Sequence, residues 1–166
     1  MLTKFKRSAN VLFLDPLSIE TIVCEKGKKF DIILSPKMYW VKKMPLPLSS
    51  VREVTKLLPS IFEDSLPPGN YSYYAYKSEN EFILFAYEDK KILELILKQG
   101  ISSSDIATVR FAQSEFETLE GAVSITDKES MYVKDGLVVL APREYSSSIR
   151  FVGACFCSKR SLASFI

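Results

Sequence analysis

The first part of the chain alternates short apolar runs with polar turns. Apolar runs occupy Asn10–Leu14, Ile19–Cys24 and Phe30–Leu34, and an aromatic-rich run follows at Met38–Met44. Short runs that are rich in β-branched and aromatic residues and bounded by proline, glycine or charged turns are typical of strands. The pattern therefore predicts that the chain opens with three antiparallel strands and continues into a further strand.

In two later segments, the apolar residues recur at the spacing of an α-helix. The first begins at Ser50, whose spacing to Glu53 is that of a capping box. Pro59 lies inside this helix and has no backbone N–H group, so we expect a kink or a break there. The second helix is expected to be capped by Asp89 and to end at Gly100. The apolar positions are Val51, Val54, Leu58, Ile61 and Phe62 in the first helix and Ile92, Leu93, Ile96 and Leu97 in the second.

Turn-forming residues separate the strands of the middle region. Tyr71–Tyr76 and Glu81–Tyr87 flank a polar turn, which predicts a hairpin. We expect the tyrosines of this hairpin to pack on one face of a sheet. Ser102–Asp105 is expected to form a brief helical turn and Ile106–Phe111 a strand, whereas the pattern at 113–119 favours no single structure.

The last third of the chain is predicted to be rich in strands. Expected strands are Gly121–Thr126, Ser130–Lys134 and Leu137–Ala141, and the last two are joined by a turn that contains Gly136. A further strand is expected at Ile149–Cys157, followed by a frayed tail at 158–166. We expect residues 1–166 to form a single domain, because a chain of this length with 47% apolar residues suits one hydrophobic core.

Composition narrows the class of protein. No apolar run approaches the roughly 20 residues that a membrane span needs, and the basic start Met1–Arg7 lacks the apolar core of a signal peptide. The net charge of +2 comes from dispersed basic residues, which argues against direct binding of nucleic acid. Cys24, Cys155 and Cys157 suit free thiols in a reducing compartment, and without histidine they do not complete a zinc site.

The chain offers no recognisable catalytic constellation. It has no histidine to act as a base, and its serines lie in expected caps and loops. Neither the Gly-x-x-x-x-Gly-Lys-Ser nor the Gly-x-Gly-x-x-Gly phosphate motif is present. The acidic pairs Glu63-Asp64 and Glu88-Asp89 lie at expected helix ends, where capping and solvation account for them. We therefore predict no catalytic, cofactor-binding or metal-binding residues, no cofactor and no enzymatic activity.

The order of these elements resembles the first half of actin-like ATPase folds, and more closely the PilM/GspL family. Members of that family are cytoplasmic assembly-platform proteins of type IV pilus and type II secretion machines. The resemblance rests on Ile32–Pro36 leading to Met44–Pro47, on Leu58–Glu63 and on Ile83–Gly100. Leu58–Glu63 is similar to the Leu-Pro-x-x-Leu/Ile-Glu pattern of the family, and Ile83–Gly100 is similar to its strand that enters a helix ending in glycine.

The resemblance covers roughly residues 10–120. It implies a mixed α+β fold that consists of a truncated RNase H/actin-like subdomain followed by a short β-rich C-terminal region. The subdomain would have two main helices and a mixed sheet that opens with antiparallel strands. One departure concerns the phosphate loop, which in actin-like ATPases has an Asp-x-Gly pattern between the first two strands. Here Asp15 is followed by Pro16 and Leu17, so a water on a metal ion is the most that Asp15 could hold. From a length of 166 residues we also expect no second nucleotide-binding subdomain.

The function implied by the resemblance is that of a non-catalytic scaffold. It would lie at the cytoplasmic face of the inner membrane in a type II secretion, type IV pilus or DNA-uptake complex. It would dock a secretion/pilus-type assembly ATPase and bitopic inner-membrane assembly proteins. Formation of a homodimer is compatible with this function. We expect sheet edges to make these contacts, those of Gly121–Ala141 first. The alternatives are a small nucleotide-binding protein with a degenerate phosphate loop and an α+β module of an unrelated complex.

Overall fold

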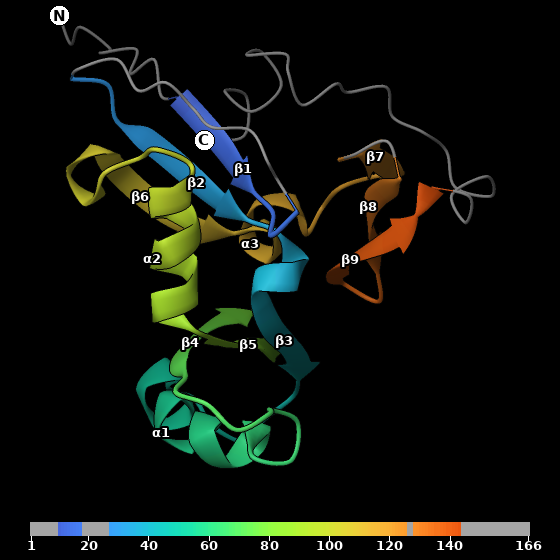
Figure 1. The fold of residues 1–166 in the computed structure, drawn as a ribbon. Coiled ribbons are helices and arrows are strands. Elements are labelled where there is room, and N and C mark those ends of the chain that lie inside the picture. The colour runs from blue at the N-terminus through green and yellow to red at the C-terminus, as the bar shows by residue number, and fades with distance from the viewer. Residues whose placement is uncertain (1–9, 18–26, 126–127, 144–166) are drawn as a thin grey trace, which may run out of the picture.

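A computed structural model describes residues 10–17, 27–125 and 128–143. In this part of the chain, nine strands form three sheets with the orders β1-β2-β6, β3-β5-β4 and β7-β8-β9 (Figure 1). The strands are β1 (Asn10–Leu14), β2 (Phe30–Leu34), β3 (Tyr39–Met44), β4 (Ser72–Ser78), β5 (Glu81–Tyr87), β6 (Ile106–Phe111), β7 (Ala122–Ser124), β8 (Glu129–Lys134) and β9 (Leu137–Pro142). The helices are α1 (Val51–Phe62), α2 (Asp89–Lys98) and α3 (Ala112–Phe116), with single 3₁₀ turns η1 (Pro36–Met38) and η2 (Ser103–Asp105). The mixed α+β fold with two main helices is confirmed.

The prediction of an antiparallel opening is wrong. β1 pairs with β2 in parallel, from Asn10 opposite Phe30 to Leu14 opposite Leu34, and β2 pairs with β6 in parallel as well. Parallel neighbours need a crossover of about a dozen residues or more, and the segment 15–29 is long enough to supply one. The expected strand Ile19–Cys24 falls outside the described residues. β3 belongs to a different sheet, where it pairs antiparallel with β5.

Alternation along β5 divides the middle of the molecule into two apolar cores. Ile83 and Phe85 face one side, where they join β2 and α2 in what we call the α2 core. Phe82, Leu84 and Ala86 face the other side and pack against α1, which gives the α1 core. Both faces of β5 are therefore covered, which explains why its sequence is almost continuously apolar.

β2 makes the corresponding division in the parallel sheet. Ile32 and Leu34 face the α2 core, whereas Ile33 points to the opposite face. There it meets α3 and the β7-β8-β9 sheet through Met131 and Val138, which form a C-terminal core. In Figure 1 the parallel sheet with α2 occupies the upper part, α1 and its sheet the lower part, and the β7-β8-β9 sheet the right.

The expected helix α1 is confirmed, with two differences. Ser50 caps it, but the Ser50 hydroxyl accepts its hydrogen bond from the N–H of Arg52, two residues on, rather than from Glu53. The helix also continues through Pro59 without a break. Of the predicted stripe, Val54, Leu58 and Phe62 are fully buried in the α1 core, Ile61 is partly buried and Val51 is exposed.

Helix α2 also forms where the sequence predicts it. Its N-cap is Glu88 instead of Asp89, and the Asp89 carboxylate accepts a hydrogen bond from the Ser72 hydroxyl. Gly100 follows the helix with a φ of 85°, in the left-handed region expected of a helix-terminating glycine. The ambiguous segment that follows β6 forms the short helix α3.

The C-terminal strands are confirmed, and Asp135 and Gly136 make the tight turn between β8 and β9 with φ values of 53° and 77°. The β4–β5 hairpin is confirmed too, but its tyrosines do not pack on one face. Tyr73 lies at the α1 core, whereas Tyr76 lies at the α2 core. The predictions for Ile149–Cys157 and 158–166 fall outside the described residues.

Within the described ranges, no helix has both the length and the apolar character needed to cross a bilayer.

Candidate functional site

The carboxyl ends of β1, β2 and β6 meet at one edge of the parallel sheet. In open sheets of this kind, ligands bind beyond the carboxyl ends of the strands. Asp15 follows β1, Ser35 follows β2, and Gln113 lies just after β6. This edge is therefore the place where a catalytic or phosphate-binding site of this fold would be expected.

Asp15 is engaged by its own surroundings. Asp15 is buried, with only 2% of its surface exposed. One carboxylate oxygen accepts a hydrogen bond from the Ser35 hydroxyl at 2.8 Å, and the other accepts one from the N–H of Leu17 at 2.9 Å. Ser35 in turn donates its N–H to the carbonyl oxygen of Leu14 at 2.9 Å. These bonds tie the end of β1 to the end of β2.

Pro16 and Leu17 occupy the place of a phosphate loop. Glycines in such a loop would let several backbone N–H groups approach a phosphate. Here the N–H of Leu17 already donates to Asp15, and proline has no N–H group to offer. The local geometry is that of a closed turn.

The third strand end is filled in the same way by Gln113, which is fully buried. Its side-chain amide donates to the carbonyl oxygen of Gly136 at 2.8 Å and accepts from the N–H of Val138 at 2.8 Å. Its own N–H donates to the phenolic oxygen of Tyr39 at 3.0 Å. Burial raises the pKa of the Tyr39 phenol well above its usual range, which keeps the ring neutral. Gln113 thus fastens the β8–β9 turn to the parallel sheet.

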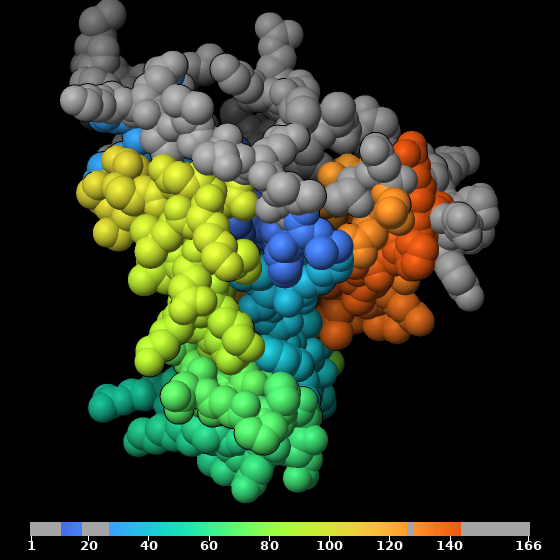
Figure 2. Space-filling model, viewed as in Figure 1, coloured from blue at the N-terminus to red at the C-terminus, as the bar shows by residue number. Residues whose placement is uncertain are grey.

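The second feature is a groove between α2 and β6, which we call the α2–β6 groove. Unlike the carboxyl edge of the parallel sheet, it is open. The groove has a volume of about 710 Å³ and runs between α2 and β6, with Leu34 and Ile96 among the buried residues that line it. Large apolar side chains remain exposed along it: Leu93 at 44%, Val109 at 45% and Tyr74 at 47%. In Figure 2, α2 lies in the yellow-green column above the α1 lobe.

Val109 shows why the groove exists. It lies opposite Ile32 in the parallel sheet, so both side chains point to the α2 side. Ile32 is fully buried in the α2 core, whereas almost half of Val109 is exposed, which means that α2 leaves this part of β6 uncovered. On its far side, β6 pairs with no other strand among the described residues. Among the described residues, an apolar surface and an open strand edge therefore lie side by side.

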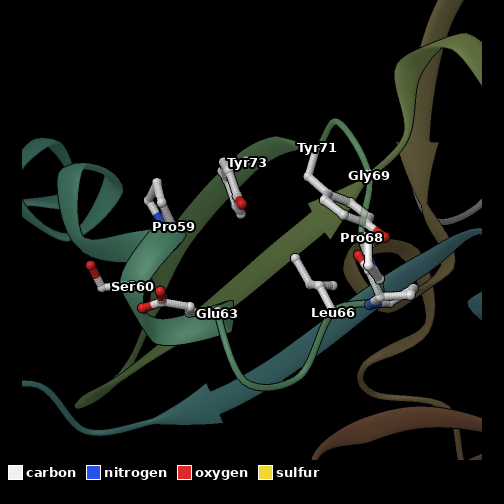
Figure 3. A pocket seen from close by; sticks show the side chains of 9 residues that line it. Pro59, Ser60, Glu63, Leu66, Pro68, Gly69, Tyr71 and Tyr73 are labelled. Atoms are coloured by element: carbon white, nitrogen blue, oxygen red, sulfur yellow. Dashed lines mark hydrogen bonds between the residues drawn. The ribbon is translucent and has the colours of Figure 1, made fainter.

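A third feature is a smaller hollow of about 500 Å³ at the carboxyl end of α1 (Figure 3). Pro59, Ser60 and Glu63 of the helix end form one side of it. Tyr71 and the turn 67–69 form the other side, and Tyr73 of β4 completes the wall. Most of these residues are exposed, and two tyrosine rings give the hollow its apolar character.

Of the residues in these sites, only Asp15 is considered from the sequence as a possible ligand-binding residue, whereas Ser35, Gln113 and Leu93 are not. The exposure of Leu93 has a signal in the sequence: Ile92 and Ile96 form one pair at helical spacing, and Leu93 and Leu97 form a second. The structure buries the first pair and leaves the second exposed. The partners Ser35 and Gln113 have no comparable signal, because their contacts depend on which strands pair.

The fold is similar to one that has been solved. The cytoplasmic domain of EpsL, an inner membrane component of the type II secretion system of Vibrio cholerae, superimposes with a TM-score of 0.53 and 11% sequence identity. The similarity covers 72% of this chain and 53% of the EpsL chain, so this chain spans about half the length of that solved domain. At this identity the similarity concerns the fold. No family model and no curated protein sequence matches the chain.

The described residues contain no group of three or more Asp, Glu, Cys or His side chains placed to hold a metal ion. Cys24, Cys155 and Cys157 fall outside the described residues, so the structure does not place the thiols considered from the sequence.

Proposed function

We propose that this chain is a non-catalytic cytoplasmic scaffold of an inner-membrane complex of the type II secretion, type IV pilus or DNA-uptake kind. It docks an assembly ATPase and bitopic membrane partners. The similarity in fold to the EpsL domain supports this class of complex. The observation that carries the docking role is the α2–β6 groove, where exposed apolar side chains lie beside an open strand edge.

The groove suits an apolar, extended segment of a partner protein. The unpaired N–H and C=O groups of β6 would form a ladder with the backbone of that segment. Alternate side chains of the added strand would then lie over Leu93, Val109 and Tyr74. Burying these three residues removes apolar surface from water, which favours association.

Two features favour β6 over the strands of Gly121–Ala141 as the docking edge. β7 has only three residues, and β9 ends at Pro142, which has no N–H group for a ladder. β6 has six residues, no proline and a single charge, Arg110. It therefore lacks most of the devices that protect an edge strand from pairing.

Affinity capture from the native cells tests this proposal. The tagged chain is the bait, and mass spectrometry identifies what is retained. We expect an assembly ATPase or a single-span inner-membrane protein. Leu93→Asp should reduce its recovery about tenfold or more, because a charge would be buried in the groove.

Leu57→Asp is the matched control, since Leu57 is 45% exposed on α1, away from the groove, against 44% for Leu93. It should leave recovery unchanged. The proposal fails if only unrelated soluble enzymes are retained, or if the Leu93 and Leu57 variants retain the partner equally well.

A further inference from the structure

The hollow at the end of α1 has walls that are already ordered. The Tyr71 ring packs edge-on against Trp40, with ring centres 5.3 Å apart, and its hydroxyl donates to the carbonyl oxygen of Pro67 at 2.9 Å. A Cβ atom at Gly69 would lie 3.2 Å from the Tyr71 ring, so glycine allows the turn to close on that ring. Because the rings are held before binding, a ligand would lose little free energy in ordering them.

The charged residue that lines this hollow is acidic. Glu63 lines it and Asp64 follows, and within the described residues neither carboxylate makes an ion pair. Both lie at the carboxyl end of α1, where the helix dipole adds negative potential, and the last turn of α1 has no basic residue.

One cation does approach the same helix end, from β3. The Lys42 ammonium donates to the carbonyl oxygen of Ile61 at 2.8 Å and to the Ser65 hydroxyl at 2.7 Å, and it lies 4.9 Å from the centre of the Phe62 ring. Lys42 thereby caps the helix end on the side of β3. The Glu63 carboxylate remains exposed at the mouth of the hollow.

We propose that this hollow binds an arginine side chain carried by an extended segment of a partner protein. A guanidinium group is flat and cationic, so it stacks on tyrosine rings and donates paired hydrogen bonds to a carboxylate. Tyr71 and Tyr73 supply the rings, and Glu63 supplies the carboxylate. The inference rests on the proposed docking function, since the arginine belongs to a partner, but it concerns a surface separate from the α2–β6 groove.

Peptide titration followed by NMR of the ¹⁵N-labelled chain tests the inference. The probe is the peptide acetyl-Ala-Pro-Arg-Pro-Ala-amide, and the comparison peptide carries citrulline, which has nearly the same shape without the charge. We expect the arginine peptide to shift the backbone signals of Gly69, Tyr71 and Tyr73. Glu63→Gln should weaken its binding by about fivefold, which is the upper range for an exposed ion pair.

Glu53→Gln is the matched control, because Glu53 is exposed in the first turn of the same helix. It should leave the affinity unchanged, and the spectra themselves report whether each variant is folded. Equal binding of the citrulline peptide, no change on Glu63→Gln, or shifts confined to other residues would overturn the inference. Those results would leave the proposed scaffold function standing, since that function depends on partner capture and on Leu93.

Discussion

The carboxyl edge of the parallel sheet and the α2–β6 groove lie on the same sheet and differ in almost every physical respect. At the edge, Asp15, Ser35 and Gln113 are buried, and each forms hydrogen bonds with neighbouring parts of the chain. In the groove, Leu93 and Val109 are large, apolar and nearly half exposed. The polar groups at the edge thus hold the fold together, whereas the large apolar groups of the groove stay exposed.

The largest expected effect distinguishes the floor of the groove, represented by the buried Ile96, from its rim, represented by the exposed Leu93. Ile96 and Leu93 lie one turn apart on α2, but Ile96 is 2% exposed and part of the α2 core. Ile96→Ala should lower the free energy of unfolding by about 2–5 kcal/mol, because it leaves a cavity. Leu93→Ala should change it by no more than about 0.5 kcal/mol, as expected for a surface position. Chemical denaturation measures both values, and similar losses in the two variants would mean that the rim belongs to the core.

The next largest effect is a loss of stability expected at the carboxyl edge of the parallel sheet. Asp15→Ala removes two hydrogen bonds and leaves the buried Ser35 hydroxyl without its acceptor. We expect a loss of about 2–3 kcal/mol in the free energy of unfolding, since hydrogen bonds to charged groups are the stronger ones. When Ser35→Ala is already present, Asp15→Ala should lower the free energy of unfolding by much less than it does alone. A double-mutant cycle measures this coupling. Additive effects would show that the two residues act separately.

The smallest expected effect is the response to nucleotide. ATP with magnesium should leave the unfolding temperature unchanged, because Asp15 is bonded to Ser35 and Leu17 and the adjoining residue is Pro16. A ligand present at a hundred times its dissociation constant would add about 2.7 kcal/mol to the stability. A thermal shift assay distinguishes the two cases, and a rise of several degrees with ATP would favour the alternative of a nucleotide-binding protein.

Much of the fold could be predicted because local patterns determine it. The stripe Val54, Leu58 and Phe62 and the cap at Ser50 identify α1, and Gly100 identifies the end of α2. Strand pairing could not be predicted in the same way. An apolar run such as Phe30–Leu34 suits a parallel strand as well as an antiparallel one, and its partner β6 is distant along the chain.

The error in pairing also hid the candidate site. In the predicted antiparallel order, the strand expected at Ile19–Cys24 would separate β1 from β2, whereas the direct parallel pairing brings Asp15 to Ser35. The groove has a related explanation. Val109 is exposed because α2 leaves this part of β6 uncovered, and this depends on the position of the helix across the sheet rather than on the residues next to Val109.

Hydrogen–deuterium exchange of the chain with and without a captured partner tests the central claim most directly. We expect the partner to slow the exchange of backbone amides in β6 by about tenfold or more, which corresponds to about 1.4 kcal/mol of added protection. The amides of β7, β8 and β9 should exchange at the same rate in both states. Protection of the β7-β8-β9 sheet with β6 unchanged would contradict the account.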